Sequence, residues 1–335
     1  MPGAARIAVL GAGAWGTALA VHLARQGHAV MLWEREAAQA ARLQADRANP
    51  RYLPGINFPQ GLAVGADLAA CLQPAEAVLA VIPSAGFRDL LQRLRPLLTP
   101  AQGLAWATKG LEYHTGKLLH TVAREELPPG LPVAMLSGPS FAAEVARGLP
   151  TAIALAADDQ AHARRWQALL HGPTFRTYLS QDLPGVGLAG AYKNVLAIAA
   201  GISDGLRYGH NARAALITRG LAEMTRLGLR LGGRLETFMG LAGLGDLVLT
   251  CTGDLSRNRR LGFALAAGQN LEQAQQAIGQ VTEGVDSARA VLALNARQGE
   301  DLPIATQVAR ILFEGLPATD AVRELLARDP RTEAG

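Results

Sequence analysis

The chain is poor in cysteine, and this excludes two structural classes. Cys71 and Cys251 are the only cysteines in 335 residues, so neither a disulfide framework nor a metal site is expected. No apolar run reaches the roughly 18 residues of a membrane span, because Gly, Pro or charge interrupts each candidate. A strand pattern begins directly after Ala5, so we expect no signal peptide. These absences predict a cytoplasmic protein without a membrane span.

Charge is also scarce. Charged residues make up 18% of the chain and hydrophobic residues 49%, which is typical of a well-buried globular protein, and 335 residues predict two domains. The net charge of +4 is modest and the arginines are scattered, which favours anionic small molecules over nucleic acid. The one dense patch, Arg257, Arg259 and Arg260, is short enough to hold a phosphate.

Lysine is the scarcest cation. Three of the 32 basic residues are lysines and the other 29 are arginines. Lys109 and Lys193 each lie beside a motif that can carry chemistry. Because an arginine keeps its proton near neutral pH whereas a lysine in a dry site can exchange one, both lysines are candidates for proton transfer.

A glycine-rich turn follows the first apolar run, Arg6 to Leu10. The turn is Gly11-Ala12-Gly13-Ala14-Trp15-Gly16, a helical pattern runs on to Arg25, and a second apolar run spans Ala29 to Trp33. In a dinucleotide-binding unit the first glycine permits the tight turn, the second lets a pyrophosphate approach, and the third lets helix and strand pack closely. The pattern predicts dinucleotide binding, with a purely structural glycine turn as the alternative.

Glu34 and Arg35 follow the second strand and favour different cofactors. An acidic residue there accepts hydrogen bonds from the ribose 2′-hydroxyl of NAD, whereas an arginine pairs with the 2′-phosphate of NADP. We favour NADP with NAD tolerated, on the expectation that Arg35 swings over the adenine while Glu34 points away. The alternative is that both are solvated loop charges.

Further apolar runs in the first half predict a parallel sheet covered by helices on both faces. They are Ala77 to Ile82, Leu104 to Ala107, Val133 to Leu136, Thr151 to Ala156 and Phe175 to Tyr178. Ligands bind at the carboxyl ends of such strands, where this sequence places Pro83-Ser84, Thr108-Lys109-Gly110 and Ser137-Gly138-Pro139-Ser140. Ser140 either caps a helix beginning near Phe141 or lies in a ligand-binding turn, and spacing alone does not decide.

From Leu183 onward helical periodicity replaces the strand pattern, so we expect a dinucleotide-binding domain at residues 1–180 and a helical domain at 181–335. A helix over Gly187 to Gly201 is apolar on every side and should be buried, yet it carries Lys193 and Asn194. A buried ammonium needs a carboxylate, a substrate anion or a lowered pKa. The alternative is an ion pair that only holds two helices together.

Two more segments of the second half carry polar groups at meaningful spacing. The glycine-rich stretch Phe238 to Gly245 suggests a turn that presents Asp246, and Thr250 would follow on the same helical face. Ser256-Arg257-Asn258 opens another helix, where a helix N-terminus and a guanidinium together suit a phosphate. An ordinary helix cap with surface arginines is the alternative.

Six blocks together resemble the bacterial NAD(P)-dependent sn-glycerol-3-phosphate dehydrogenases. They begin at Gly11, Thr108, Ser137, Lys193, Gly240 and Ser256, and they follow in order through nearly the whole chain. The resemblance implies a Rossmann-type, doubly wound, mostly parallel sheet joined to an all-helical C-terminal domain. It also implies a homodimer that interconverts dihydroxyacetone phosphate and sn-glycerol 3-phosphate with NADP or NAD, for glycerophospholipid synthesis.

The resemblance also assigns site residues. Lys193 would be the proton acceptor, with Lys109, Asp246 and Asn194 as its catalytic partners. Substrate contacts would be Lys109, Gly138, Ser140, Lys193, Asp246, Thr250, Ser256, Arg257 and Asn258. Cofactor contacts would be Gly11, Gly13, Ala14, Trp15, Gly16, Arg35, Lys109, Ala142, Arg257, Val281 and Glu283. Two positions depart from the family pattern: Ala14 replaces a more usual serine, and Gly187 stands where a longer polar residue is expected.

The resulting hypothesis is hydride transfer between the nicotinamide and C2 of the substrate. Lys193 would act as general acid/base, Asp246 and Asn194 would orient it, and Arg257 and Asn258 would hold the phosphate. Two alternatives stay open: a reductase of β-hydroxyacids or 2-ketoacids, and a regulatory protein that binds NADP without turnover.

Overall fold

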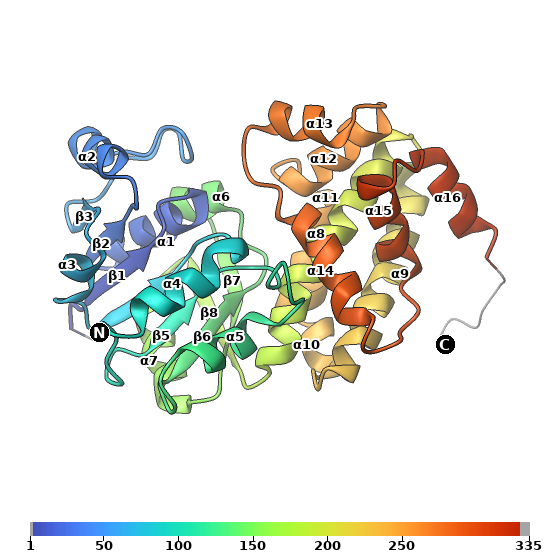
Figure 1. Cartoon of the computed structure of the whole chain (residues 1–335). Coiled ribbons are helices and arrows are strands. Elements are labelled where there is room, and N and C mark those ends of the chain that lie inside the picture. The colour runs from blue at the N-terminus through green and yellow to red at the C-terminus, as the bar shows by residue number, and fades with distance from the viewer. Residues whose placement is uncertain (1–2, 329–335) are drawn as a thin grey trace.

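The computed structural model describes residues 3–328 and contains two lobes side by side (Figure 1). The blue-to-green half of the chain forms a sheet covered by helices. The yellow-to-red half is helical. The last strand ends at Ser180 and the long helix α8 begins at Leu183, so the change in architecture falls close to where the sequence pattern changes.

The sheet has eight strands in the order β3-β2-β1-β4-β5-β6-β7-β8. Their bounds are β1 Arg6–Leu10, β2 Ala29–Trp33, β3 Leu62–Gly65, β4 Ala77–Ala80, β5 Leu104–Trp106, β6 Val133–Ser137, β7 Thr151–Ala157 and β8 Phe175–Ser180. Strands β1 to β6 are parallel, β7 pairs antiparallel with β6, and β8 is parallel to β7. The predicted fold class, a mostly parallel doubly wound sheet with a helical domain, is confirmed.

Helices cover both faces of this sheet, as the continuous apolar strands require. One apolar core lies between the sheet and α1, α6 and α7, and a second lies between the sheet and α3, α4 and α5. The helices of this lobe are α1 Ala14–Arg25, α2 Ala37–Asp46, α3 Leu68–Leu72, α4 Phe87–Leu94, α5 Leu119–Glu126, α6 Ala142–Arg147 and α7 Gln160–Leu170.

The second lobe is built around α8, Leu183–Gly205, which is buried along nearly its whole length. Two glycines let α12 cross it closely: a Cβ on Gly201 would lie 2.0 Å from the carbonyl oxygen of Arg259, and one on Gly262 would lie 2.2 Å from that of Ile198. The other helices are α9 Gly209–Arg230, α10 Leu235–Met239, α11 Asp246–Thr252, α12 Arg257–Ala266, α13 Leu271–Ile278, α14 Glu283–Asn295, α15 Pro303–Phe313 and α16 Ala318–Leu326.

Within residues 3–328, two helical stretches are long and apolar enough, by length and composition, to cross a membrane, contrary to the expectation that no apolar run reaches about 18 residues. They are Leu183–Gly205 and Leu235–Thr252. The first is α8, whose most apolar window is 100% buried within the protein, so its composition has a structural explanation as the central helix of the lobe.

Candidate active site

The glycine turn has the backbone geometry that a dinucleotide needs. Gly11 has φ +117°, and a Cβ there would lie 2.4 Å from the carbonyl oxygen of Val81. A Cβ on Gly16 would lie 1.9 Å from the carbonyl oxygen of Gly11, so this glycine lets α1 approach β1. Nothing lies within 4 Å of a Cβ on Gly13, and no side chain caps the N-terminus of α1. The turn therefore offers open space beside free backbone amides, which fits a pyrophosphate.

Asn49 supports the glycine turn, a role that the sequence analysis did not predict. Its buried amide donates to the carbonyl oxygen of Ala12 at 2.8 Å and to the hydroxyl of Thr17 at 2.9 Å. The loop after α2 thus ties the glycine turn to the first turn of α1. A polar residue in the loop between α2 and β3 carries no local sign that it will be buried.

The two residues weighed for cofactor preference both lie near the surface. Glu34 is partly exposed and accepts a hydrogen bond from the backbone amide of Glu36 at 3.1 Å. The side chain of Arg35 is 76% exposed and lies 3.4 Å from the carboxylate of Glu36. Arg35 is thus free to move toward a ligand, and the preference for NADP stays a prediction.

The two lysines singled out in the sequence meet at one carboxylate. The Nζ of Lys193 on α8 lies 2.7 Å from Oδ1 of Asp246 and 3.0 Å from the hydroxyl of Thr250. The Nζ of Lys109, in the loop after β5, lies 2.8 Å from Oδ2 of Asp246 and donates to the carbonyl oxygen of Gly138 at 3.2 Å. Segments from both lobes therefore build one cluster, with Thr250 one turn beyond Asp246 as predicted.

Burial sets the electrostatics of this cluster. The side chains of Lys109, Lys193 and Asp246 are 12%, 8% and 1% exposed. Burial lowers the pKa of Lys193 to about 8; the charge of Lys109 acts in the same direction, while Asp246 opposes it. Burial alone would raise the pKa of Asp246, but the two ammonium groups outweigh it and hold that pKa below its usual value. Lys193 is thus a lysine that can exchange a proton near neutral pH.

Gly138 and Ser140 lie next to this cluster, after β6. Gly138 has φ +144°, and a Cβ there would lie 2.9 Å from Cα of Ile153. The hydroxyl of Ser140 donates to the carbonyl oxygen of Gly138 at 2.8 Å. Helix α6 begins at Ala142 with Phe141 at its N-cap and no capping side chain, so the interpretation of Ser140 as a helix cap is wrong.

Asp246 is held differently from the prediction of a glycine-rich turn. Leu241–Gly245 forms a π-helical segment that runs directly into α11. A Cβ on Gly243 would lie 2.1 Å from the carbonyl oxygen of Phe238, so the wide turn can close only around a glycine. The segment aims Asp246 at α8 rather than presenting it on a loop.

Asn194 does not orient Lys193, and that part of the hypothesis is wrong. Adjacent residues of a helix point in different directions, so the Asn194 side chain lies away from its neighbour. Its oxygen accepts from the amide of Asn258 at 3.0 Å, and its own amide reaches Oε2 of Glu283 at 3.5 Å. Asn258 in turn accepts from the backbone amide of Gly284 at 3.0 Å. Asn194 and Asn258 join α8, α12 and α14, and the cofactor candidate Glu283 lies beside them.

The three arginines of the patch, Arg257, Arg259 and Arg260, have different surroundings. Arg259 is buried against Asp204 at 2.8 Å and Asp254 at 2.9 Å. Arg260 is exposed. The side chain of Arg257, the first residue of α12, makes no hydrogen bond or ion pair within residues 3–328. Ser256 caps this helix by accepting from the amide of Arg259 at 3.3 Å, so the N-cap interpretation holds for Ser256 and Arg257 stays available for an anion.

The remaining candidates occupy the edges of these elements. Trp15 and Ala142 are partly buried and pack against the core beneath α1 and α6. Val281 is 52% exposed, just before α14. A Cβ on Gly187 would lie 3.5 Å from the side chain of Leu118, an ordinary van der Waals contact, so this distance does not explain the absence of a longer residue there. Within residues 3–328 no cluster of His, Cys, Asp or Glu could hold a metal.

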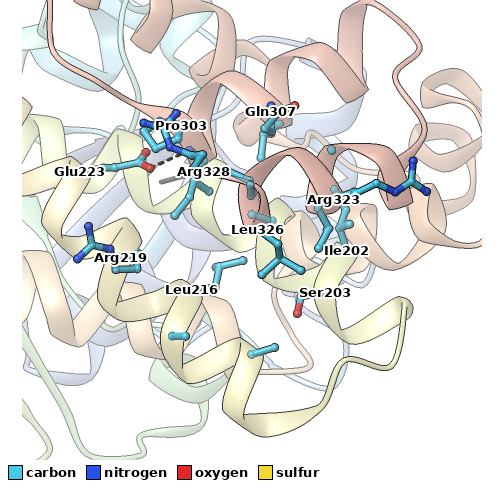
Figure 2. A pocket seen from close by; sticks show the side chains of 18 of the residues that line it. Ile202, Ser203, Leu216, Arg219, Glu223, Pro303, Gln307, Arg323, Leu326 and Arg328 are labelled. Atoms are coloured by element: carbon cyan, nitrogen blue, oxygen red, sulfur yellow. Dashed lines mark hydrogen bonds between the residues drawn. The ribbon is translucent and has the colours of Figure 1, made fainter. Parts of the chain in front are cut away.

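A cavity of about 1000 Å³, which neither Lys109 nor Lys193 lines, lies between α8, α9, α15 and α16 (Figure 2). Its lining is mostly apolar and includes Ile202, Leu216 and Leu326. Glu223 lies at one end of it, where its carboxylate accepts from the hydroxyl of Tyr192 at 2.9 Å and from the first amides of α15. Glu223 therefore caps a helix in an apolar setting.

The burial of Glu223 leads to a prediction about how the free energy of unfolding depends on pH. Burial raises the pKa of Glu223 from its ordinary 4.5 to about 7, so the folded state binds the proton more tightly and the free energy of unfolding falls as pH rises between these values. Because Glu223→Gln stays neutral, its stability relative to the wild type should rise by about 2 kcal/mol between pH 5 and 8. Denaturant unfolding at both pH values measures this. The exposed Glu236→Gln is the control, and parallel pH profiles would contradict the prediction.

Comparison with known proteins places the chain. The family models described as the N-terminus and C-terminus of NAD-dependent glycerol-3-phosphate dehydrogenase match residues 6–163 and 182–323. The chain belongs to this family. It is 56% identical over 327 residues to "Glycerol-3-phosphate dehydrogenase [NAD(P)+]" of Thioalkalivibrio sulfidiphilus, covering 98% of each chain. A relative of the same name from Thiobacillus denitrificans is 54% identical, over 98% of this chain and 99% of the relative.

A solved structure agrees with this assignment. The glycerol-3-phosphate dehydrogenase of Coxiella burnetii superposes with a TM-score of 0.94 at 50% identity, covering 97% of this chain and 99% of that one. The family resemblance seen in the sequence is therefore confirmed.

Proposed function

We propose that the protein is an NAD(P)-dependent glycerol-3-phosphate dehydrogenase. It transfers a hydride reversibly between NAD(P)H and dihydroxyacetone phosphate, giving sn-glycerol 3-phosphate for glycerophospholipid synthesis. The observation that carries the mechanism is the buried cluster in which Lys193 and Lys109 share Asp246. Full-length relatives named for this activity support the substrate.

Lys193 is the general acid and base of this mechanism. In reduction its ammonium donates a proton to the C2 oxygen as a hydride arrives, and in oxidation its amine takes that proton back. Asp246 and Thr250 hold Nζ in place through contacts of 2.7 Å and 3.0 Å. Lys109 adds a second positive charge beside the developing alkoxide, which stabilises it in a site that is largely shielded from water.

Arg257 binds the substrate phosphate, together with the N-terminus of α12. Asn258 and Ser256 contribute mainly by fixing that helix, since their side chains already have protein partners. Gly138 and Ser140 complete the substrate side. The turn from Gly11 to Gly16 binds the dinucleotide together with Arg35, Ala142, Val281 and Glu283, and the nicotinamide supplies or accepts the hydride when it is bound.

The wider setting is also proposed. The boundary near residue 180 separates a dinucleotide-binding domain, residues 1–180, from a helical substrate domain, residues 181–335. The protein acts in the cytoplasm as a homodimer, with neither a nucleic-acid partner nor a membrane span. Arg35 favours NADP while NAD is accepted.

Turnover of dihydroxyacetone phosphate tests the function directly. Oxidation of NADPH and of NADH should be followed by absorbance with dihydroxyacetone phosphate, and in parallel with glyoxylate and other 2-ketoacids, as substrate. We expect turnover with dihydroxyacetone phosphate and not with the 2-ketoacids. Arg257→Met should raise KM for dihydroxyacetone phosphate about 100-fold, because one charge-assisted phosphate contact is lost. The control is Arg230→Met, an exposed arginine. Preference for a 2-ketoacid would favour a ketoacid reductase, and binding of NADPH without any turnover would favour a sensor.

A further inference from the structure

The loop that carries Lys109 continues into a hairpin that touches both lobes. Residues 111–118 form this hairpin, closed by a bridge between Leu111 and Leu118. Both leucines are buried in the core of the helical lobe, although the hairpin grows from the sheet lobe. Lys109 lies two residues before it, so the placement of the hairpin determines where Lys109 can reach.

Two ion pairs fix the hairpin to the sheet lobe: Arg88 on α4 with Glu112, and Lys117 with Glu125 on α5. Arg88 on α4 holds Glu112 through two contacts, 2.5 Å from Nε to Oε1 and 3.0 Å from Nη2 to Oε2. The hydroxyl of Thr115 also donates to Glu112. The side chain of Glu112 is only 14% exposed, and the bond from Arg88 holds its pKa below the usual value, so this ion pair stays charged at working pH.

The tip of the hairpin contacts α14 of the helical lobe. Arg289 donates to the hydroxyl of Tyr113 at 2.6 Å. Gly116 has φ +67°, and a Cβ there would lie 3.0 Å from the carbonyl oxygen of Ala290, so the two backbones approach closely. The hairpin is thus held to the sheet lobe by the ion pairs of Glu112 and Lys117, and to the helical lobe by its two buried leucines and its tip.

We propose that Arg88 and Glu112 are positioning residues for Lys109: their ion pair sets the hairpin, and through it the place where Lys109 meets Asp246 and the substrate. Neither residue belongs to the site described above. The inference rests on the proposed function in taking Lys109 as an active-site group, while the contact between Lys109 and Asp246 can be tested without turnover.

The structure supplies a matched control. Glu126 also pairs with Arg88, and its side chain is 15% exposed, close to the 14% of Glu112. Glu126 ends α5 and has no contact with the hairpin among its described hydrogen bonds and ion pairs. Glu112→Gln and Glu126→Gln therefore remove the same charge from the same arginine, but only the first loosens the hairpin.

Steady-state kinetics of the two variants should differ. Glu112→Gln should lower kcat at least tenfold with KM for NADPH unchanged, because a misplacement of about 1 Å can cost about 100-fold. Glu126→Gln should stay within about twofold of the wild type. An equal fall in both variants would overturn the proposal while leaving the dehydrogenase function intact.

The pH profile separates positioning from a general loss of structure. The charged and titratable groups around Lys193 are Asp246 and Cys251 on α11, Lys109, and Glu283 on α14. If Lys109 moves away, a repelling charge is lost and Asp246 pairs with Lys193 alone, so the kinetic pKa should rise above that of the wild type in Glu112→Gln only. If the kinetic pKa of Glu112→Gln equals that of the wild type, the proposal is overturned.

A third measurement needs no turnover. Acetylation of Lys109 by a water-soluble amine reagent, followed by mass spectrometry, should be several-fold faster in Glu112→Gln than in Glu126→Gln, because the Lys109 ammonium loses its fixed partner. If Glu112→Gln does not fold, Thr115→Val removes one bond to Glu112 while keeping its charge, and it should show the same direction of change. Equal labelling rates in a folded variant and in the control would refute the positioning role.

Discussion

Replacing Lys193 by Ala should lower kcat by about 10²–10⁴-fold while cofactor affinity stays nearly intact. The pKa of this amine, about 8, lets it both give and take a proton near neutral pH. The glycine turn, which is the proposed dinucleotide site, lies on a different lobe and does not depend on this side chain. Stopped-flow measurement of the hydride step and titration of NADPH binding by fluorescence separate the two effects.

Lys193→Arg sharpens this test. The guanidinium keeps the positive charge beside Asp246 but cannot give up its proton, so this variant should be as inactive as the alanine variant if proton transfer is the role. Added methylamine should restore part of the rate of Lys193→Ala. Near-normal turnover by either variant would remove Lys193 from the mechanism.

The pH dependence of the wild type follows from the same pKa. Oxidation of glycerol 3-phosphate needs the free amine, so its rate should rise about tenfold per unit below pH 8 and level off above it. Reduction needs the ammonium, so its rate should fall above that pH. The rates of oxidation and reduction should therefore change in opposite directions with pH, and both pH profiles should give the same kinetic pKa.

The sequence predicted the sheet well where burial is complete. Strands such as β1, β4 and β6 are continuous apolar runs, and no surface helix reproduces that pattern. The prediction missed β3, a four-residue edge strand in which only Leu62 is buried, because so short and half-exposed a run has no period to detect. It also missed the reversed direction of β7, since strand direction depends on how the chain returns to the sheet and not on local composition.

The sequence predicted which types of residue form the site, but it did not predict how their side chains are arranged. A lysine in an apolar helix requires a counter-charge, and it is the family resemblance, not the spacing, that assigns Asp246 to this lysine. Which arginine of the patch stays free could not be read from spacing, because Arg259 is neutralised by Asp204, more than 50 positions away in the chain. The same holds for Asn49, whose role depends on a loop folding back over the glycine turn.

Replacing Asp246 by Asn should affect both activity and stability. Its carboxylate is 1% exposed and lies 2.7 Å and 2.8 Å from two ammonium groups. Removing that charge leaves two buried cations facing a neutral amide, and breaking a buried pair in this way costs about 3–5 kcal/mol of the free energy of unfolding. The pKa of Lys193 should fall further, because the attraction that opposed its burial is gone.

The sign of the pH effect identifies the cause. A lysine whose pKa is lower in the folded state than in the unfolded state favours folding more as pH rises. The loss in the free energy of unfolding caused by Asp246→Asn should therefore shrink between pH 6.5 and 9. Thermal unfolding at both pH values measures it, and Asp254→Asn, which removes an exposed carboxylate from the same lobe, should show no such trend. A deficit that stays constant with pH would mean that Asp246 acts through packing and not through its charge on the lysines.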